Sequence, residues 1–113
     1  MKLKSLDGLT AVPFKERVVP VPELEKDGEI VIREMSAARM ADFQKYSSED
    51  EEHSDEHLLI ACMVDEDGNQ IINHERAPHV ATIFSIEVRD RLLSAVIELH
   101  PYLFDKKKAS EQS

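Results

Sequence analysis

The feature that most constrains the fold of this chain is a pair of strand-like runs. A tight turn joins them, and a capped helix follows them directly. The first run ends in Pro20 and Pro22, which cannot donate backbone hydrogen bonds and so confine a strand to the edge of a sheet. Asp27-Gly28 precedes the second run and is a strong hairpin signal, because a type I′ turn needs positive φ at both central residues. We therefore expect a β-hairpin over residues 13–35.

A helix is predicted directly after the second strand. Ser36 is a favourable N-cap residue, and the segment 37–43 that follows it consists mostly of good helix formers. Met40 and Phe43 fall on one face of such a helix and are expected to pack on the hairpin. From here the sequence predicts a mainly helical region over residues 36–100.

The middle of the chain combines an acidic run, residues 47–57, with seven consecutive apolar residues, 58–64. The acidic run fits either a disordered linker or the start of a helix. Ser48 and Glu51 have the spacing of a capping box, and carboxylates in a first turn are stabilised by the helix dipole, so a helix is favoured. A strand remains an alternative for 58–64, because a short apolar run has no period that separates the two.

Apolar residues recur at three- and four-residue spacings in residues 86–99, which predicts a long amphipathic helix. Ser85 can cap it, Pro101 ends it, and Pro78 can start a shorter helix before it. Glu87 and Arg91 form a favourable i, i+4 pair on its outer side. The apolar positions of the long helix are Val88, Leu92, Leu93, Val96, Ile97 and Leu99.

The chain of 113 residues therefore reads as one small α+β domain, an N-terminal antiparallel β-hairpin packed on three to four helices. A flexible arm is expected at 1–12 and a polar tail at 105–113. The formal net charge of −9 would repel phosphate backbones, so we expect no nucleic acid partner. No apolar run approaches the roughly 20 residues needed to cross a bilayer, which argues against a membrane partner. The one cysteine, Cys62, is expected to be a buried core residue.

No pattern in the sequence carries recognisable catalytic chemistry, and we expect no enzymatic activity, no catalytic residues and no cofactor. His53 and His57 lie one helical turn apart among carboxylates, which makes them the best candidates for metal ligands. The spacing H-S-D-E-H departs from the zinc motif H-E-x-x-H, however, and surface histidines in an acidic turn explain it better. The adjacent carboxylates at 49–52 are better explained as a solvated face than as an acid and base pair.

The order of these parts resembles the tail assembly chaperone family of long, non-contractile-tailed phages and prophages. Three stretches in particular carry the resemblance, and Phe43 adds to it; it covers about residues 14–100. The stretches are Val19-Pro20-Val21-Pro22-Glu23, Val31-Ile32-Arg33-Glu34-Met35-Ser36-Ala37-Ala38 and Val64-Asp65-Glu66-Asp67-Gly68-Asn69.

The resemblance implies a non-enzymatic protein that binds the tape measure protein, keeps it soluble and assists assembly of the tail tube. It also implies the tail tube protein and a longer, frameshifted form of the same chain as further partners. Lys106-Lys107-Lys108 would suit a slippery adenine-rich message, although ordinary lysine codons explain the three lysines equally well. The implied location is the cytoplasm of the bacterial host, with the protein absent from the mature virion.

A holdase for an apolar client must offer it apolar surface while a charged exterior faces water. Two surfaces are candidates, the open edge of the hairpin and the face of the last long helix. An open hairpin edge can also pair between chains, so a homo-oligomer is a further expectation. The candidate partner-binding residues are Val19, Val21, Val88, Leu92, Leu93, Val96, Ile97 and Leu99.

The acidic run motivates an alternative function from another class. Residues 49–56 present six carboxylates and no lysine or arginine. Such a run could mimic the charge of DNA and capture a basic protein, which would make the chain an acidic regulator or inhibitor.

Overall fold

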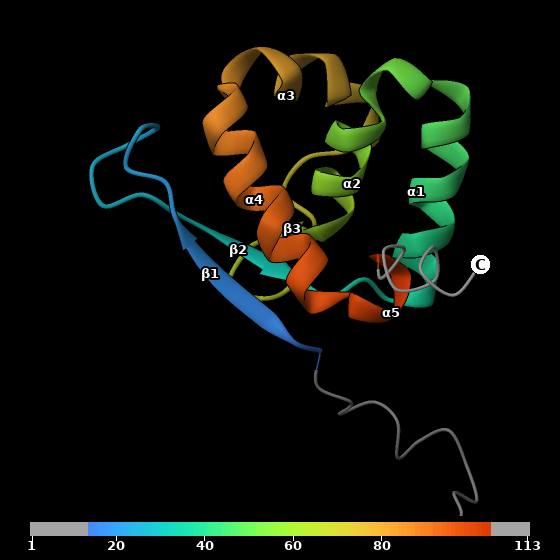
Figure 1. Cartoon of the computed structure of the whole chain (residues 1–113), viewed down its shortest axis with the longest axis horizontal. Helices are drawn as coiled ribbons and strands as arrows, with labels where there is room; N and C mark the ends of the chain where they lie inside the picture. The colour runs from blue at the N-terminus through green and yellow to red at the C-terminus, as the bar shows by residue number, and fades with distance from the viewer. Residues whose placement is uncertain (1–13, 105–113) are drawn as a thin grey trace, which may run out of the picture.

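The computed structural model describes residues 14–104, so the predicted arm at 1–12 and the predicted tail at 105–113 lie outside the described residues. Figure 1 shows the helices gathered on one side of an N-terminal hairpin, which is the α+β arrangement predicted from the sequence. A third strand and the short α5 were not predicted. The elements are β1 (Glu16–Pro20), β2 (Glu29–Arg33), α1 (Ala37–Glu49), the 3₁₀ turn η2 (Glu51–His53), α2 (Ser54–Cys62), β3 (Met63–Val64), the 3₁₀ turn η3 (His74–Arg76), α3 (Ala77–Ile83), α4 (Ile86–Leu99) and α5 (Pro101–Phe104).

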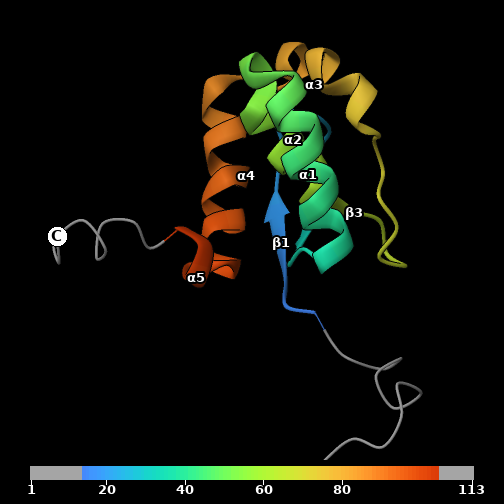
Figure 2. The same cartoon turned by 90° about the vertical axis from the view of Figure 1, so that its right-hand side faces the viewer.

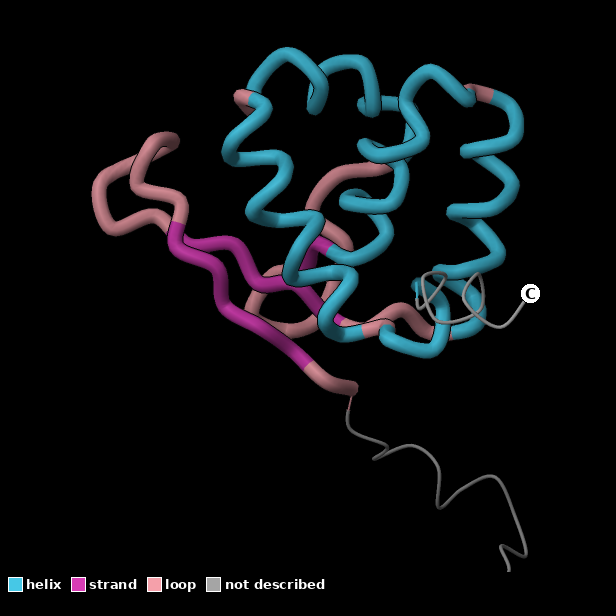
Figure 3. Tube along the Cα trace, viewed as in Figure 1, coloured by secondary structure: helices cyan, strands magenta, loops and turns pink. Residues whose placement is uncertain are grey.

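The sheet has three strands in the order β1-β2-β3, and both neighbouring pairs are antiparallel. Val18 lies opposite Val31, and Ile32 lies opposite Met63. β1 is an edge strand, as its prolines predicted. Figure 3 shows how β3 adds to the far side of the hairpin immediately after a helix ends.

The predicted type I′ turn is wrong. Pairing ends at Val21, whose N–H donates to the Gly28 carbonyl at 2.8 Å, and residues 22–27 form a wider loop beyond it. This loop is built from two turns, in which Leu24 N–H donates to the Val21 carbonyl and Gly28 N–H to the Glu25 carbonyl. Gly28 is needed for space rather than for positive φ, because a Cβ there would lie 2.8 Å from the Glu25 oxygen.

Ser36 caps α1 as predicted, and its hydroxyl accepts from the Arg39 N–H at 3.1 Å. The predicted capping box of Ser48 and Glu51 is wrong, because α1 continues to Glu49. Inside this helix the Ser48 hydroxyl donates to the Lys45 carbonyl instead. The acidic run is consequently divided between the end of α1, η2 and the first turn of α2.

The apolar run 58–64 adopts both of the conformations that the sequence left open. Its first five residues complete α2, and Met63 and Val64 then form β3. All of these residues are buried, because α2 packs against α1, α3 and α4 at the centre of the molecule. A helix covered on every side has no polar stripe, which explains why the sequence showed no period here.

α4 is the predicted amphipathic helix, and the Ser85 hydroxyl caps it by accepting from Val88 N–H at 3.2 Å. Its buried face packs on β1, β2 and α2. Figures 1 and 2 show the ribbon of α4 beside those of β1 and α2. Pro78 lies in the first turn of α3, near its predicted place at the helix start. Within residues 14–104, no helix has the length and apolar character required to cross a membrane.

His100 connects the end of α4 to the junction between β2 and α1. Its ring is fully buried, Nδ1 lies 2.6 Å from the Val96 carbonyl, and Nε2 accepts from the Met35 N–H at 2.9 Å. Since a carbonyl can only accept and an N–H can only donate, these contacts define a neutral imidazole with its proton on Nδ1. The sequence suggested only a helix end here.

Candidate functional site

Most of the predicted partner-binding residues lie in the core rather than on the surface. Leu93 is partly buried, and only Ile97 is well exposed, at 46%. The others are buried where the hairpin, α2 and α4 pack together, and they cannot meet a partner in this conformation. These buried residues are Val19, Val21, Val88, Leu92, Val96 and Leu99.

The hairpin presents Val18 to solvent, not Val19. Val18 is 53% exposed, whereas Val19 is buried because side chains alternate between the two faces of a strand. The prediction named Val19 and Val21, which share one face of the strand, and the structure shows that this face packs on the core. The alternation in the neighbouring strand, with Ile30 and Ile32 on one side, predicts two faces but not which of them meets α4.

The outer edge of β1 keeps backbone groups available. The Val21 N–H donates to the Gly28 carbonyl, and the Lys15 carbonyl accepts from the Glu34 N–H. Because inward and outward backbone groups alternate along an edge strand, Glu16 and Val18 direct their N–H and C=O groups away from the sheet. Pro20 has no N–H, and its carbonyl accepts from Arg91 Nη1 at 3.1 Å. The open edge therefore extends over only two residues before a side chain of α4 covers it.

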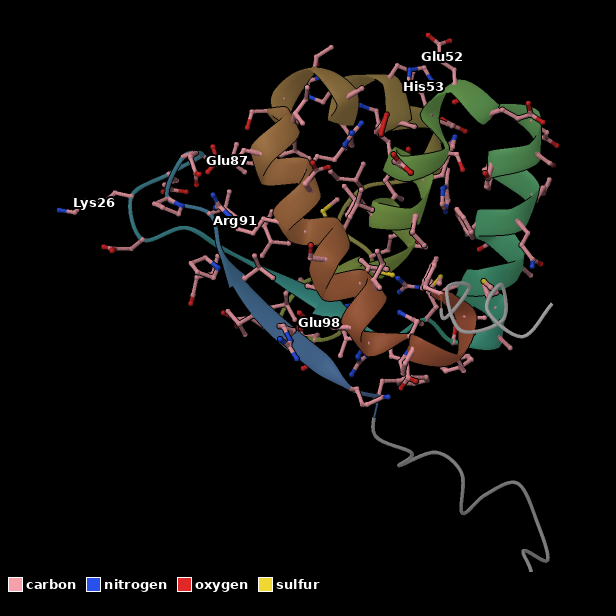
Figure 4. All side chains as sticks on the ribbon, in the orientation of Figure 1. Lys26, Glu52, His53, Glu87, Arg91 and Glu98 are labelled. Atoms are coloured by element: carbon pink, nitrogen blue, oxygen red, sulfur yellow. The ribbon has the colours of Figure 1, made fainter. Side chains whose placement is uncertain are left out.

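Ion pairs join α4 to the hairpin. Arg91 binds both carboxylate oxygens of Glu23 at 2.9 and 2.5 Å and also meets Glu87 at 3.5 Å, which confirms the predicted i, i+4 contact. Arg17 of β1 pairs with Glu98 of α4. Figure 4 shows Arg91 and Glu98 on the side of α4 that faces β1. The hydrogen bonds from Arg91 lower the pKa of the Glu23 carboxyl to about 2.

A polar cluster at the opposite end of the molecule contains the predicted metal candidates. Asp50 accepts from His53 Nδ1 and from His57 Nε2, each at 3.0 Å. His57 Nδ1 lies 3.0 Å from His74 Nδ1, and the His74 ring stacks on Tyr46 at 4.6 Å between centroids. The cluster thus ties the end of α1, η2, α2 and η3 together.

The hydrogen bonds of this cluster determine where its protons lie when His57 is neutral. His57 must donate from Nε2 to the Asp50 carboxylate, so its Nδ1 accepts from His74 Nδ1–H. His74 Nε2 then carries no proton, and it is buried without a hydrogen-bond partner among the described residues. Burial, and next the neighbouring His57, lower the pKa of His74, whereas the hydrogen bond to Asp50 raises the pKa of His53.

The described residues contain no group of three or more histidine, cysteine or acidic side chains arranged to hold a metal ion. Asp50 is occupied by two imidazoles, and the two buried imidazole rings use their facing nitrogens on one another. His53 and His57 are therefore brought together as parts of a hydrogen-bonded network between helices. His79 lies on α3, and His74 lies in η3.

The acidic run does not form a continuous acidic surface. Glu56 is buried, with Arg89 Nη1 4.0 Å from its carboxylate, and Asp50 accepts hydrogen bonds from the two imidazoles described above. Glu49, Glu51, Glu52 and Asp55 remain exposed, and Asp55 lies 3.9 Å from Arg89 Nη1. A mimic of DNA requires a regular row of exposed charges, so the geometry gives this alternative little support.

Cys62 is fully buried at the end of α2, and burial raises the pKa of its thiol to about 12. A thiol in this environment stays protonated and unreactive. The predicted role of Cys62 as a core residue is confirmed.

An apolar groove that the sequence did not predict lies between the loop after β3 and the helical segment η3–α3. It encloses about 330 Å³, and Ile71 and Ile83 at its sides are 47% and 40% exposed. The loop wall is held by a backbone bridge between Val64 and Gln70. Its lining residues are Ile71, Ile72, Asn73, Arg76, His79 and Ile83.

The fold and these surfaces define a small, acidic α+β protein whose exposed apolar groups suit contact with other proteins. The chain is similar to a solved structure described as that of the bacteriophage HK97 tail assembly chaperone, with a TM-score of 0.59 and 26% sequence identity. The similarity covers 83% of this chain and 91% of the HK97 chain. The resemblance to tail assembly chaperones predicted from the sequence is thereby confirmed. No protein-family model matches the chain, and no curated protein sequence matches it.

Proposed function

We propose that this protein is a phage tail assembly chaperone that binds the tape measure protein, keeps it soluble and assists assembly of the tail tube. The observation that carries the proposal is the structural similarity to the HK97 tail assembly chaperone over most of both chains. The identification of the tape measure protein as the client rests on the family resemblance of the three sequence stretches. The protein acts by binding, without catalysis.

The distribution of charge and apolar surface supports this role. A formal net charge of −9 keeps a complex with an apolar client soluble. Exposed isoleucines and Val18 supply apolar contact area on surfaces that the core does not use. A chaperone needs both features together, because apolar surface without a charged exterior leads to aggregation.

Co-expression of this chain with the tape measure protein of the same phage or prophage tests the proposal. The expected result is a large rise in the soluble fraction of the tape measure protein and its co-purification with the chaperone. An unrelated acidic protein of similar size and charge is the control for a general effect of expression. An insoluble fraction that stays unchanged with both proteins would contradict the proposed client.

The remaining partners belong to the same proposal. We expect the tail tube protein to join the complex after the client, and a longer frameshifted form of this chain to be made from its natural gene. Intact-mass measurement of the products of that gene reveals the second form directly. The working location is the cytoplasm of the bacterial host, and proteomics of purified virions should find the protein absent.

A further inference from the structure

We propose that the groove lined by Ile71, Ile72, Asn73, Arg76, His79 and Ile83, here called the α3 groove, is where the client docks. The occupant is an amphipathic helical segment of the client that carries a carboxylate beside its apolar residues. The inference rests on the proposed function for the existence of a client, and on the structure for the place and chemistry of its contact.

The helical wall of the groove is a regular outward-facing stripe. Arg76, His79 and Ile83 follow one another at spacings of three and four residues along η3 and α3, which places them on one face. Ala77 and Val80 turn to the inner side of the same segment and are fully buried. Because the core holds this inner face, the outer stripe is fixed in orientation before any partner arrives.

The loop wall is also held in place. Gln70 pairs with Val64 through the backbone, and its side-chain amide donates to the Ile72 carbonyl at 2.7 Å. Ile72 packs against the core and forms the floor, while Ile71 stands at the rim. A preformed groove avoids the ordering cost that a flexible surface would incur on binding.

Charge selects the kind of partner. Four of the six described arginines, Arg17, Arg33, Arg89 and Arg91, pair with carboxylates, and a fifth, Arg39, donates to the carbonyls of Ala61 and Gly68. Arg76 is the exception within residues 14–104, because no described carboxylate lies within 4 Å of it. A guanidinium without a described carboxylate partner, at the rim of an apolar groove, favours an incoming carboxylate. Such a cation is an exception on a protein whose formal net charge is −9.

The shape of the groove favours a helix. The stripe from Arg76 to Ile83 spans about two helical turns, which matches anchors at i, i+3 or i+4, and i+7 on a partner helix. An adjoining depression shares Ile71 with the groove and is lined in part by Asp65, Glu66 and Asp67. A client segment that is acidic throughout would meet these carboxylates, so it is disfavoured relative to one with a single carboxylate beside its apolar residues.

The test compares Ile83→Asp with Leu24→Asp in the co-expression assay. These two apolar residues have similar exposure, 40% and 47%, but Leu24 lies in the loop between β1 and β2, outside the groove. We expect Ile83→Asp to lower the amount of co-purified client by roughly tenfold or more, as loss of an apolar anchor does, and Leu24→Asp to leave it within about twofold. Circular dichroism of both variants verifies that each one is folded.

Arg76→Glu tests the charge. It should lower client recovery by a similar factor, and a photoreactive amino acid placed at position 79 should crosslink a client segment that contains an aspartate or glutamate. Changing that acidic residue to lysine should restore binding to Arg76→Glu but not to Ile83→Asp.

The outcomes separate the two proposals. If the unaltered chain fails to solubilise the client, the proposed function fails and the groove assignment fails with it. If the unaltered chain succeeds and Ile83→Asp performs like Leu24→Asp, the function stands and the α3 groove is not the docking site. Recovery that depends on Ile83 but is indifferent to Arg76→Glu would overturn the carboxylate requirement.

Discussion

The hydrogen bonds of His100 predict how much the free energy of unfolding falls when its ring is removed. The Met35 N–H donates to Nε2 in a fully buried environment, so a side chain without an acceptor leaves that amide unpaired. An unpaired buried amide costs about 1–3 kcal/mol, and the lost bond to the Val96 carbonyl adds about 1 kcal/mol. His100→Leu, which keeps much of the ring's volume, should therefore lower the free energy of unfolding by about 2–4 kcal/mol.

That loss is a large part of the roughly 5–15 kcal/mol that stabilises a domain of this kind, and it corresponds to a fall in Tm on the order of 10 °C. Urea unfolding followed by circular dichroism measures it. His100→Gln is the matched variant, because its amide oxygen can reach a position near Nε2 and accept from Met35. It should lose markedly less stability than His100→Leu. Tyr102→Ala, at an exposed neighbouring position, should change the free energy of unfolding by less than about 0.5 kcal/mol.

Hydrogen exchange identifies the cause of the change. The Met35 amide should exchange slowly in the unaltered chain and in His100→Gln, and much faster in His100→Leu. Equal stability of His100→Leu and the unaltered chain, within about 0.5 kcal/mol, would refute the importance given to this bond. Equal loss in the leucine and glutamine variants would show that ring packing, rather than the acceptor, is responsible.

Three further predictions concern other parts of the molecule. Gly68 has φ +83°, so Gly68→Ala should lower the free energy of unfolding, measured in urea, by about 1–2 kcal/mol. A Cβ at this position would also lie 2.1 Å from Arg33 Nη1. If Gly68→Ala lowers the stability by the same amount in an Arg33→Ala background, backbone strain rather than this clash is the cause. The pKa of His74 is lowered in the folded chain, so the unfolded chain binds a proton at this residue more readily, and stability should be lost as pH falls below about 6.5. His74→Asn should remove this part of the pH dependence of the free energy of unfolding. An unchanged pH dependence in His74→Asn would contradict the prediction. Arg91→Gln should return the pKa of Glu23 from about 2 towards its ordinary value of 4.5 in an NMR titration, while Arg89→Gln should leave it unchanged. A Glu23 pKa that stays near 2 in Arg91→Gln would show that the bidentate pair is not its cause.

Local signals in the sequence predicted the framework well. Ser36 and Ser85 cap their helices because a hydroxyl can satisfy an N–H in the first turn whatever surrounds it. Pro20 limits the edge strand for an equally local reason. The i, i+4 pair of Glu87 and Arg91 also needs only the helix that contains it.

Predictions that depended on surroundings were less successful. Ser48 and Glu51 have the spacing of a capping box, yet α1 continues through Ser48, since nothing in that short segment specifies where the preceding helix stops. Asp27-Gly28 suggested a tight turn, but pairing of Val21 with Gly28 sets a wider loop. In both cases the decision involved contacts beyond the residues that carried the signal.

The sequence by itself determined the α+β class, the hairpin, the capped helices and a family resemblance, because each follows from local propensities or from their order along the chain. Only the tertiary structure decided which apolar residues remain exposed. Val19 and Leu92 carry no mark that separates them from Val18 and Ile97, since burial depends on which face meets another element. The α3 groove likewise exists only because a loop and a helix meet, and the cluster of His57 and His74 only because the fold brings residues 17 positions apart within 3.0 Å.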